Sequence, residues 1–551
     1  MPANGVPCAV LVRRLAVLLC VLVTAAPASA ATKLVVTGRG WGHGVGMSQW
    51  GAYGYARHGW RWQRILAHYY TGTTLGDAPV AKVRVLLEEK RTAARIGCAG
   101  GIRVSDATGR SWSLAPGTYA VGRKLRLPVG HKRLPVQRGR EHRERFVVVP
   151  ARRTLRSPVV LDCPTAPLVL NGRAYHGTLI VRRHAKKLSV VNTLPLDQYV
   201  RGVVAGEMPF RWTIGALAAQ AVAARSYALA TLKPGKTFDL YDDTRSQVYG
   251  GIAYETTRTN LAVAKTANKV LLWHGHVATT FFFSTSGGRT ADVREVWPRL
   301  GDVPYLRAVD DPYDARSPHH LWGPVTLDAA RVAKRLHVPA GAFSVVRSAG
   351  SGHVRSVRVG SRSVDGDTFR HDLGLASTWF ELGELSLAGS RPQVRFGGKV
   401  GLAMAAEGVG RARLQRRIGA GSWKTLAVVD GRRRVTVEPR GHTLYRLATR
   451  TVTGPVVAVA VAPRLRVEPA AAEELSGTVE PVLRGELTVM RRVAAGWKVV
   501  AHPKLDARGA FTAPLRLRPG TYRVTRAGDA RYAPATASLL VTTRLLASLS
   551  H

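Results

Sequence analysis

One long helical pattern lies among many short strand-like runs, and this mixture limits the folds open to the chain. Residues 196–232 are predicted to be helical, because residues 214–232 are rich in alanine and free of proline, and Thr213 is a plausible N-cap. Residues 82–195 instead alternate apolar and polar side chains in short runs broken by Gly and Pro, which predicts antiparallel strands. From about residue 391 the pattern is strand-like throughout. The sequence therefore predicts the α+β class, with a mixed domain rich in antiparallel strands followed by all-β, sandwich-like modules.

A chain of 551 residues is too long for a single hydrophobic core. We expect a first domain over residues 31–385, with residues 82–195 as a β-rich insertion, and two β modules over residues 391–467 and 468–551. A faint repeat supports the two modules, since Trp423-Lys424 followed by Tyr445-Arg446 recurs as Trp497-Lys498 followed by Tyr522-Arg523. Further helices are expected at residues 60–70, 258–274 and 325–336, and a buried strand at residues 277–283.

Residues 1–30 have the pattern of a secretory signal peptide. Arg13 and Arg14 precede an apolar stretch, and Ala28-Ser29-Ala30 forms a small-residue cleavage site. Cys20 does not follow a small residue, which argues against a lipoprotein anchor, and no later segment has the length and apolarity of a membrane span. We therefore expect a secreted protein without a transmembrane segment.

Cys98 and Cys163 are the two cysteines that remain after cleavage. In an oxidising compartment the simplest expectation is a disulfide between them. Closing a loop of 65 residues would contribute roughly 4 kcal/mol in the chain-entropy model. The alternative, a redox or metal-binding thiol pair, lacks close spacing and neighbouring histidines.

The net charge of +46 predicts attraction to polyanions. Residues 391–551 hold 28 Lys and Arg against 10 Asp and Glu, and the rest of the chain is also basic. A charge spread in this way favours adhesion to an acidic matrix such as anionic cell-wall polymers. Nucleic acid is not expected as a partner, because the basic stretches lack regularly spaced aromatic residues for base stacking.

Glu207 is the strongest candidate for a catalytic group. It is a lone carboxylate among aliphatic and aromatic side chains, between Tyr199 and Trp212. Such surroundings keep a carboxyl group partly protonated, as a general acid near neutral pH requires. Acid duty at pH 7 asks for a pKa about 2 units above the ordinary value of ~4.3, roughly 3 kcal/mol. The alternative is a glutamate at a helix end that accepts hydrogen bonds from backbone N–H groups.

Every second residue between Gly38 and Gly46 is glycine. If this segment is extended, one face is bare backbone and the other presents Arg39, Trp41 and His43. Bare backbone is usually kept where another chain or a ligand approaches closely, and these three side chains suit a saccharide. The alternative is a glycine-rich linker.

Other polar residues could line the same groove. Gln220 and Tyr227 share a helix face, and Arg225 could steady Glu207 or a substrate oxygen; the alternatives are a salt bridge for Arg225 and a core position for Tyr227. Residues 284–288 (Ser-Thr-Ser-Gly-Gly) offer hydroxyl groups and unhindered amides. His274 and His276 have no third ligand nearby, so no metal is expected, and the sequence calls for no cofactor.

Several motifs point to one family. Residues 196–209 (Leu-Asp-Gln-Tyr-Val-Arg-Gly-Val-Val-Ala-Gly-Glu-Met-Pro) and 218–228 (Ala-Ala-Gln-Ala-Val-Ala-Ala-Arg-Ser-Tyr-Ala) closely resemble the signature of the stage II sporulation protein D family (SpoIID/LytB). Similar motifs occur at residues 38–52, 68–72, 284–288 and 373–380, so the resemblance extends over residues 34–383. The glycine-histidine motif usually follows the glutamate segment, and here it precedes it, as in a circular permutation.

The resemblance implies a lytic transglycosylase that cleaves peptidoglycan glycan strands, preferably those stripped of stem peptides. The family's catalytic glutamate falls on Glu207, which would protonate the glycosidic oxygen and then accept the C6 hydroxyl proton as a 1,6-anhydro ring closes. Residues expected to bind substrate are His43, Gln49, Gln220, Arg225, Tyr227, Ser284, Ser286, Gly287 and Gly288. Phe283 stands where the family often has a histidine, so no metal ligand is expected there.

Two other functions remain open at this stage. The family includes enhancers of a wall amidase, so a non-catalytic wall-binding protein with an amidase partner is the first alternative. The second is hydrolysis, with Asp242 or Asp243 activating water. In each case we expect the protein outside the cell, at the cell wall.

Overall fold

The computed structural model describes residues 31–135, 146–233, 235–348 and 350–549. The predicted signal peptide lies outside these residues. Strands account for about 45% of the chain and helices for about 19%, with most strands in antiparallel sheets, so the predicted α+β class is confirmed. Within the described residues, no helix combines the length and apolarity needed to cross a membrane.

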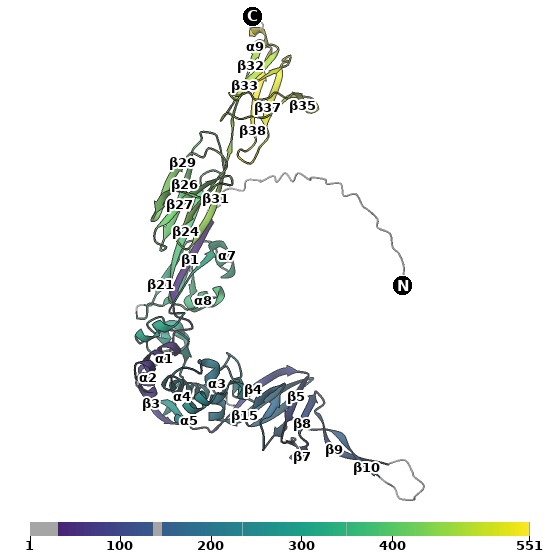
Figure 1. Ribbon diagram of the computed structural model, residues 1–551, viewed down its shortest axis with the longest axis vertical. Helices are drawn as coiled ribbons and strands as arrows, with labels where there is room; N and C mark the ends of the chain where they lie inside the picture. The colour runs from purple at the N-terminus through teal and green to yellow at the C-terminus, as the bar shows by residue number, and fades with distance from the viewer. Residues whose placement is uncertain (1–30, 136–145, 234, 349, 550–551) are drawn as a thin grey trace, which may run out of the picture. The chain divides into compact units, whose positions relative to one another are not determined.

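The chain forms two compact units (Figure 1). We call Val36–Val325 together with Arg331–Leu382 the helical unit, and the part that begins at Gly383 the C-terminal unit. The boundary between the two predicted β modules remains a prediction.

The helical unit is organised around α4 (Ile214–Ala230), which is buried over most of its length. Alanine side chains let its neighbours approach on all sides, as in a fully buried helix. Helices α1 (Gln49–Arg57), α2 (Trp62–Tyr69), α3 (Leu196–Glu207) and α5 (Thr257–Lys265) pack against it.

Three of the predicted elements differ from the structure. The helix predicted over residues 196–232 is two helices, because the chain turns extended at Met208, before Pro209, where helical geometry is disfavoured. The helix predicted over 258–274 stops at Lys265 and continues as β17 (Lys269–Trp273). The helix predicted over 325–336 is β20 (Leu321–Asp328) followed by the short α7 (Ala329–Arg335).

The strand predicted over residues 277–283 is also fragmented. It consists of β18 (His276–Val277) and β19 (Phe282–Phe283), and β19 pairs in parallel with β2 (Met47–Ser48). β18 and β3 (Thr74–Asp77) flank β17 in a small sheet. The helix predicted over residues 60–70 is confirmed as α2.

The antiparallel strands predicted over residues 82–195 are confirmed. A seven-stranded sheet has the order β16 (Leu240–Tyr241), β4 (Lys82–Arg91), β15 (Lys187–Pro195), β14 (Thr178–His184), β11 (Val159–Asp162), β6 (Ile102–Ser105) and β7 (Ser111–Leu114). A four-stranded sheet has the order β13 (Arg173–Tyr175), β12 (Leu168–Leu170), β5 (Ala93–Cys98) and β8 (Gly117–Gly122), and β9 (Arg126–Pro135) pairs with β10 (Phe146–Thr154).

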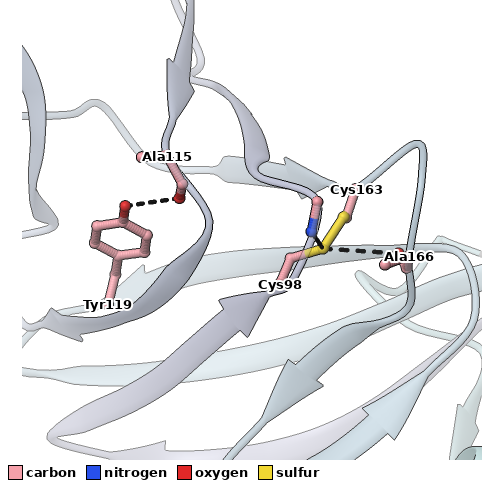
Figure 2. Close-up of a disulfide and its surroundings, with 6 residues drawn as sticks. Cys98, Ala115, Tyr119, Cys163 and Ala166 are labelled. Atoms are coloured by element: carbon pink, nitrogen blue, oxygen red, sulfur yellow. Dashed lines mark hydrogen bonds between the residues drawn. A yellow bond between two sulfur atoms is a disulfide. The ribbon is translucent and has the colours of Figure 1, made fainter.

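The predicted disulfide is confirmed (Figure 2). It joins Cys98, at the end of β5, to Cys163, which directly follows β11, and so connects the two sheets of this β-rich region. The amide of Gly100 donates to Cys98 Sγ at 3.3 Å, and Tyr119 Oη donates to the carbonyl oxygen of Ala115 at 2.8 Å. The cross-link removes conformational freedom from a loop of 65 residues in the unfolded chain.

The helical unit also contains α6 (Val293–Val296), α8 (Gly366–Leu373) and the sheet of β21 (Phe343–Arg347), β22 (Val354–Val359) and β23 (Arg362–Asp365). The chain leaves this unit along β24 (Phe380–Gly389).

The C-terminal unit consists almost entirely of strands. β26 (Val400–Glu407) lies between β24 and β29 (Gly431–Val437), and a second sheet has the order β25 (Gln393–Arg395), β31 (Thr453–Ala462), β30 (Thr443–Ala448), β27 (Ala412–Ile418) and β28 (Lys424–Val429). Further along the chain, a three-stranded sheet has the order β32 (Arg464–Ala471), β33 (Glu474–Glu480) and β36 (Ala510–Pro514). A four-stranded sheet has the order β35 (Gly496–Ala501), β34 (Thr488–Val493), β37 (Gly520–Arg526) and β38 (Ala535–Val541). Two separate hydrophobic cores fill the spaces between these sheets.

Candidate active site

Glu207 is the last residue of α3, and the break before Pro209 leaves its side chain at the helix end. The carboxyl group is partly buried and accepts one hydrogen bond, from the backbone N–H of Val248 to Oε1 at 3.1 Å. Burial raises the pKa of Glu207 above its usual value, and the hydrogen bond from Val248 opposes part of that rise. The alternative that we considered for Glu207, a glutamate at a helix end that accepts a backbone hydrogen bond, is therefore also present. They coexist with the raised pKa that an acid catalyst needs.

The negative charge of Glu207 affects the pKa of two tyrosines, Tyr199 and Tyr227. Burial raises the pKa of Tyr199 and of Tyr227, and the negative charge of Glu207 raises both further. The hydroxyl group of Tyr199 donates to Oε1 of Gln247 at 3.1 Å. Tyr227 contacts the rings of Phe281 and Phe282 at 5.8 and 6.3 Å between centroids. Tyr199 is fully buried and its hydroxyl proton is used by Gln247, so only the half-buried Tyr227 could orient a hydroxyl-rich ligand as a neutral donor.

Two exposed aromatic residues, Tyr254 and Phe210, lie near the end of α3 that carries Glu207. Tyr254 is 41% exposed, and its ring covers Gly206, where a Cβ atom would lie 2.8 Å from it. Phe210 is 45% exposed, just beyond the helix end. The ring of Trp212, two residues after Phe210, contacts the ring of Trp50 and stacks on that of Tyr53, with centroid distances of 4.8 and 4.6 Å. Aromatic faces beside a half-buried acid are suited to the apolar faces of sugar rings.

Residues 40–46 of the glycine-rich segment are not extended, so the alternating faces that an extended segment would have are not formed there. Gly40 and Gly46 have φ values of 75° and 79°, in the left-handed region that glycine tolerates best. A Cβ atom at Gly40 would lie 2.6 Å from the carbonyl oxygen of Thr285, and one at Gly46 would lie 2.1 Å from that of Phe281. The chain that approaches the bare backbone is therefore the protein's own segment after β18.

Trp41 and His43 consequently have different surroundings rather than a common face. Trp41 is 48% exposed and lies 4.3 Å from the ring of His319. His43 donates from Nε2 to the carbonyl oxygen of Phe282 at 3.1 Å, and its Nδ1 accepts from the N–H of Val45. Burial lowers the pKa of His43 to about 4. His43 is therefore neutral at pH 7, with both ring nitrogens occupied, and is unsuited to donate a proton to substrate.

The loop at residues 284–288 is held by two buried carboxylates. Ser286 Oγ lies 2.7 Å from Asp311 Oδ2 and 3.0 Å from Asp314 Oδ2, and the N–H of Gly287 donates to Asp314 at 2.5 Å. Gly288 N–H donates in turn to Ser286 Oγ, and Ser284 Oγ lies 3.2 Å from Thr285 Oγ1. These donors thus support the loop itself, and their predicted contact with substrate remains a prediction.

Further donors complete this network, which we call the buried acid network (Asp311, Asp314, Ser286, Tyr69 and His320). Tyr69 Oη donates to Asp311 Oδ1 at 2.9 Å, and His320 Nδ1 lies 2.8 Å from Asp314 Oδ1. Both carboxylates have no exposed surface. Burial, followed by the charge of Asp314, raises the pKa of Asp311 to about 7.

The structure places the remaining predicted residues as follows. Gln49 begins α1 and is 8% exposed. Gln220 is fully buried in α4, and neither atom of its amide has a hydrogen-bond partner among the described residues. Arg225 is also fully buried, but it pairs with Asp197 at 2.7 Å and donates to the carbonyl oxygen of Lys269. The salt bridge that we considered as the alternative role of Arg225 is therefore formed, and it occupies the guanidinium group.

Sequence reasoning missed the segment at residues 247–254, which brings Val248 to Glu207 and Tyr254 to Gly206. The Gln-Val-Tyr-Gly-Gly run at residues 247–251 was the available signal, because glycines beside an aromatic residue often mark a close backbone approach. Asp242, considered above only for hydrolysis, has its pKa raised to about 6 by burial, and its charge reaches Tyr199. Asp243 forms an exposed ion pair with Arg245.

The part of the chain that the structure describes contains no group of three or more His, Cys, Asp or Glu arranged to hold a metal ion. His274 lies in the turn between β17 and β18 against Trp273, and His276 begins β18.

Comparison with known proteins gives the following matches. Residues 184–273, which contain Glu207, match the family model SpoIID, described as stage II sporulation protein. The chain is 34% identical over 212 residues to stage II sporulation protein D of Bacillus subtilis, covering 35% of this chain and 61% of that protein. It is 43% identical over 115 residues to the amidase enhancer of the same organism, covering 21% of this chain and 15% of that protein.

These matches support the predicted relation to the SpoIID family. The chain spans about three fifths of the length of the sporulation proteins it matches. The glycine-histidine motif at residues 38–52 lies outside the family match, so the permuted order remains a prediction. Among solved structures, a two-domain fibronectin type-III segment of chicken tenascin covers 28% of this chain at 14% identity, but its TM-score of 0.20 supports no argument about the fold.

Proposed function

We propose that this protein is a secreted peptidoglycan lytic transglycosylase in which Glu207 is both acid and base. The observation that carries the proposal is the position of that carboxyl group. It has a raised pKa and, among the described residues, one backbone donor, and the exposed ring of Tyr254 packs on the preceding residue, Gly206. The matches to SpoIID proteins support the assignment of Glu207.

The reaction needs only one carboxyl group. The Glu207 hydroxyl would give its proton to the glycosidic oxygen as the bond from that oxygen to C1 of the muramic acid residue breaks. The resulting carboxylate would accept the proton of the C6 hydroxyl while O6 bonds to C1, which closes the 1,6-anhydro ring and restores the acid. No water enters the product, so a second carboxylate at a set distance is unnecessary.

The neighbouring residues would position the glycan. Tyr254 and Phe210 would stack on sugar rings, and the neutral hydroxyl of Tyr227 would meet a sugar hydroxyl beside Glu207. The raised pKa keeps part of the glutamate protonated near neutral pH, so activity should fall as the pH rises through that pKa.

The test is digestion of denuded glycan, analysed by mass spectrometry. The wild type should release anhydro-muramyl ends, and Glu207→Gln should not. Asp242→Asn is the control for hydrolysis: if the products carry reducing ends and their release requires Asp242, water is the nucleophile and the transglycosylase assignment is wrong.

The amidase enhancer match favours a second candidate, a wall-binding enhancer of an amidase without its own catalysis. In that case a purified wall amidase should turn over sacculi faster when the protein is added, and Glu207→Gln should stimulate it equally well. Absence of any glycan product from the wild type, together with that stimulation, would replace the first candidate by the second.

A further inference from the structure

The C-terminal unit repeats one arrangement of three side chains in two different sheets. In the first sheet, the guanidinium groups of Arg417 and Arg446 lie 4.9 and 4.0 Å from the ring centroid of Trp423. In the second, those of Arg492 and Arg523 lie 5.5 and 4.0 Å from the ring centroid of Trp497. We call these two groups the Arg-Trp-Arg sets.

The strand registers show that the two sets correspond position by position. In the first sheet, Arg416 of β27 pairs with Lys424 and Gln415 pairs with Arg446 of β30. In the second, Arg491 of β34 pairs with Lys498 and Met490 pairs with Arg523 of β37. Each set thus draws on an outer strand, its neighbour and the next strand. A slip of one residue would move these side chains to the opposite face, so basic composition alone would not produce the match.

Positive charge in the two sets is not neutralised within the described residues, where no carboxylate forms an ion pair with any of the four arginines. Other arginines of the C-terminal unit are paired, as Arg432 of β29 is with Glu407 and Arg526 of β37 with Asp529. The Nε atoms of Arg417 and Arg523 are covered and have no hydrogen-bond partner in the described chain. Burial and the charge of Arg417 lower the pKa of Arg446, as expected for two cations that lie close together.

We propose that each Arg-Trp-Arg set binds one phosphate group of an extracellular phosphodiester polymer. Stacking on an indole ring holds a guanidinium plane in place, so that its N–H edge can form two parallel hydrogen bonds to phosphate oxygens. Two sets on one chain suit a ligand that repeats the same anionic group, because the second contact benefits from the first. The inference rests on the proposed function only for the location at the cell wall.

The geometry disfavours a nucleic acid as the ligand. Single-stranded nucleic acids bind through bases that stack on open aromatic faces. A guanidinium at 4.0 Å from each ring centroid occupies such a face on both tryptophans. A polymer that offers phosphates without bases fits the two sets better.

The experiment measures binding of the full chain to a purified poly(glycerol phosphate) chain at near-physiological salt. One variant combines Arg417→Gln with Arg446→Gln, a second combines Arg492→Gln with Arg523→Gln, and a third carries all four changes. We expect each pair to weaken binding about tenfold and the four together more than a hundredfold. Charge-matched controls remove exposed arginines of the same region: Arg411→Gln with Arg450→Gln, and Arg508→Gln with Arg516→Gln. These should change the affinity by less than about threefold.

Other outcomes would overturn the inference. Equal losses in the control variants would mean that diffuse charge, rather than the two sets, binds the polymer. Tighter binding of oligo(dT), sensitive to the same four arginines, would identify nucleic acid instead. Equal binding of polyglutamate would show recognition of carboxylates and not of phosphates. The variants should retain the wild-type melting temperature and the wild-type release of products from soluble denuded glycan, so a failure here stays separate from a failure of the transglycosylase assignment.

Discussion

Glu207 and Asp311 are both buried carboxyl groups with raised pKa values, and burial is the main cause in each case. Their hydrogen bonding differs. Asp311 has no exposed surface and is bonded by Tyr69 and Ser286, whereas Glu207 is partly exposed and, within the described part of the chain, accepts only one backbone N–H. A raised pKa therefore shows where a charge is costly. Unused hydrogen-bonding capacity, together with access from outside, is what separates a candidate catalytic acid from a structural one.

The largest expected difference between the two groups is in catalysis. Glu207→Gln should reduce the initial rate of anhydro-product release from denuded glycan by about 10²- to 10⁴-fold, the usual contribution of a positioned acid and base. Asp311→Asn keeps the shape of the buried acid network and should reduce the rate by less than about tenfold. If the rate falls as far in Asp311→Asn as in Glu207→Gln, the assignment of Glu207 as the catalytic acid and of Asp311 as a structural group is wrong.

Substitution of Asp311 should reduce the stability of the protein more than substitution of Glu207 does. Asp311→Ala leaves the hydroxyl group of Tyr69 without its acceptor in the interior and removes one of the two acceptors of Ser286, and should lower the free energy of unfolding by about 3 kcal/mol. Glu207→Ala removes a single hydrogen bond at a partly exposed site and should cost about 1 kcal/mol or less. Denaturant unfolding followed by tryptophan fluorescence measures both, and equal losses would contradict the difference in bonding.

Titration of Asp311 should also make the free energy of unfolding depend on pH. Its pKa is about 7 in the folded protein and about 3.9 in an unfolded chain, so the folded state holds the proton more tightly. Stability relative to Asp311→Asn should therefore fall as the pH rises from about 4 to 7, and should stay level above pH 7. A difference of about 3 pKa units corresponds to a change of about 4 kcal/mol. A difference in unfolding free energy that is constant from pH 4 to 8 would mean that Asp311 does not titrate in this range.

Local patterns in the sequence predicted the class of the fold, the disulfide and the helical surroundings of Glu207. The end of α3 was missed because the alanine-rich residues that follow it favour a helix, whereas the break depends on Pro209. The contact of Glu207 with the backbone of Val248 joins residues 41 positions apart in the sequence. The helix predicted over 258–274 failed for a similar reason. Pairing of β17 with β3, a contact between segments far apart in sequence, outweighs the local preference.

Long-range contacts also explain why parts of the site could not be predicted. The glycine repeat suggested a ligand beside bare backbone, yet the neighbour is the segment after β18, about 240 residues further along the chain. The role of Ser286 depends on Asp311 and Asp314, two carboxylates whose neighbouring residues carry no recognisable motif. Spacing within a motif can identify Glu207, but it cannot show which of the motif's polar groups the folded chain itself uses.

The smallest expected effect concerns Gln220, which lies in α4 on the same helix face as Tyr227. Its amide is fully buried without a partner in the described chain, so Gln220→Leu should leave the stability unchanged or raise it by about 1 kcal/mol. If the amide instead meets a sugar group when the glycan binds, the same variant should raise KM severalfold while kcat changes little. Arg225→Leu is the matched control in the same helix, because it leaves Asp197 unpaired and should destabilise the protein clearly. Destabilisation of Gln220→Leu to the extent seen for Arg225→Leu would show that the amide is bonded within the protein and would remove it from the groove.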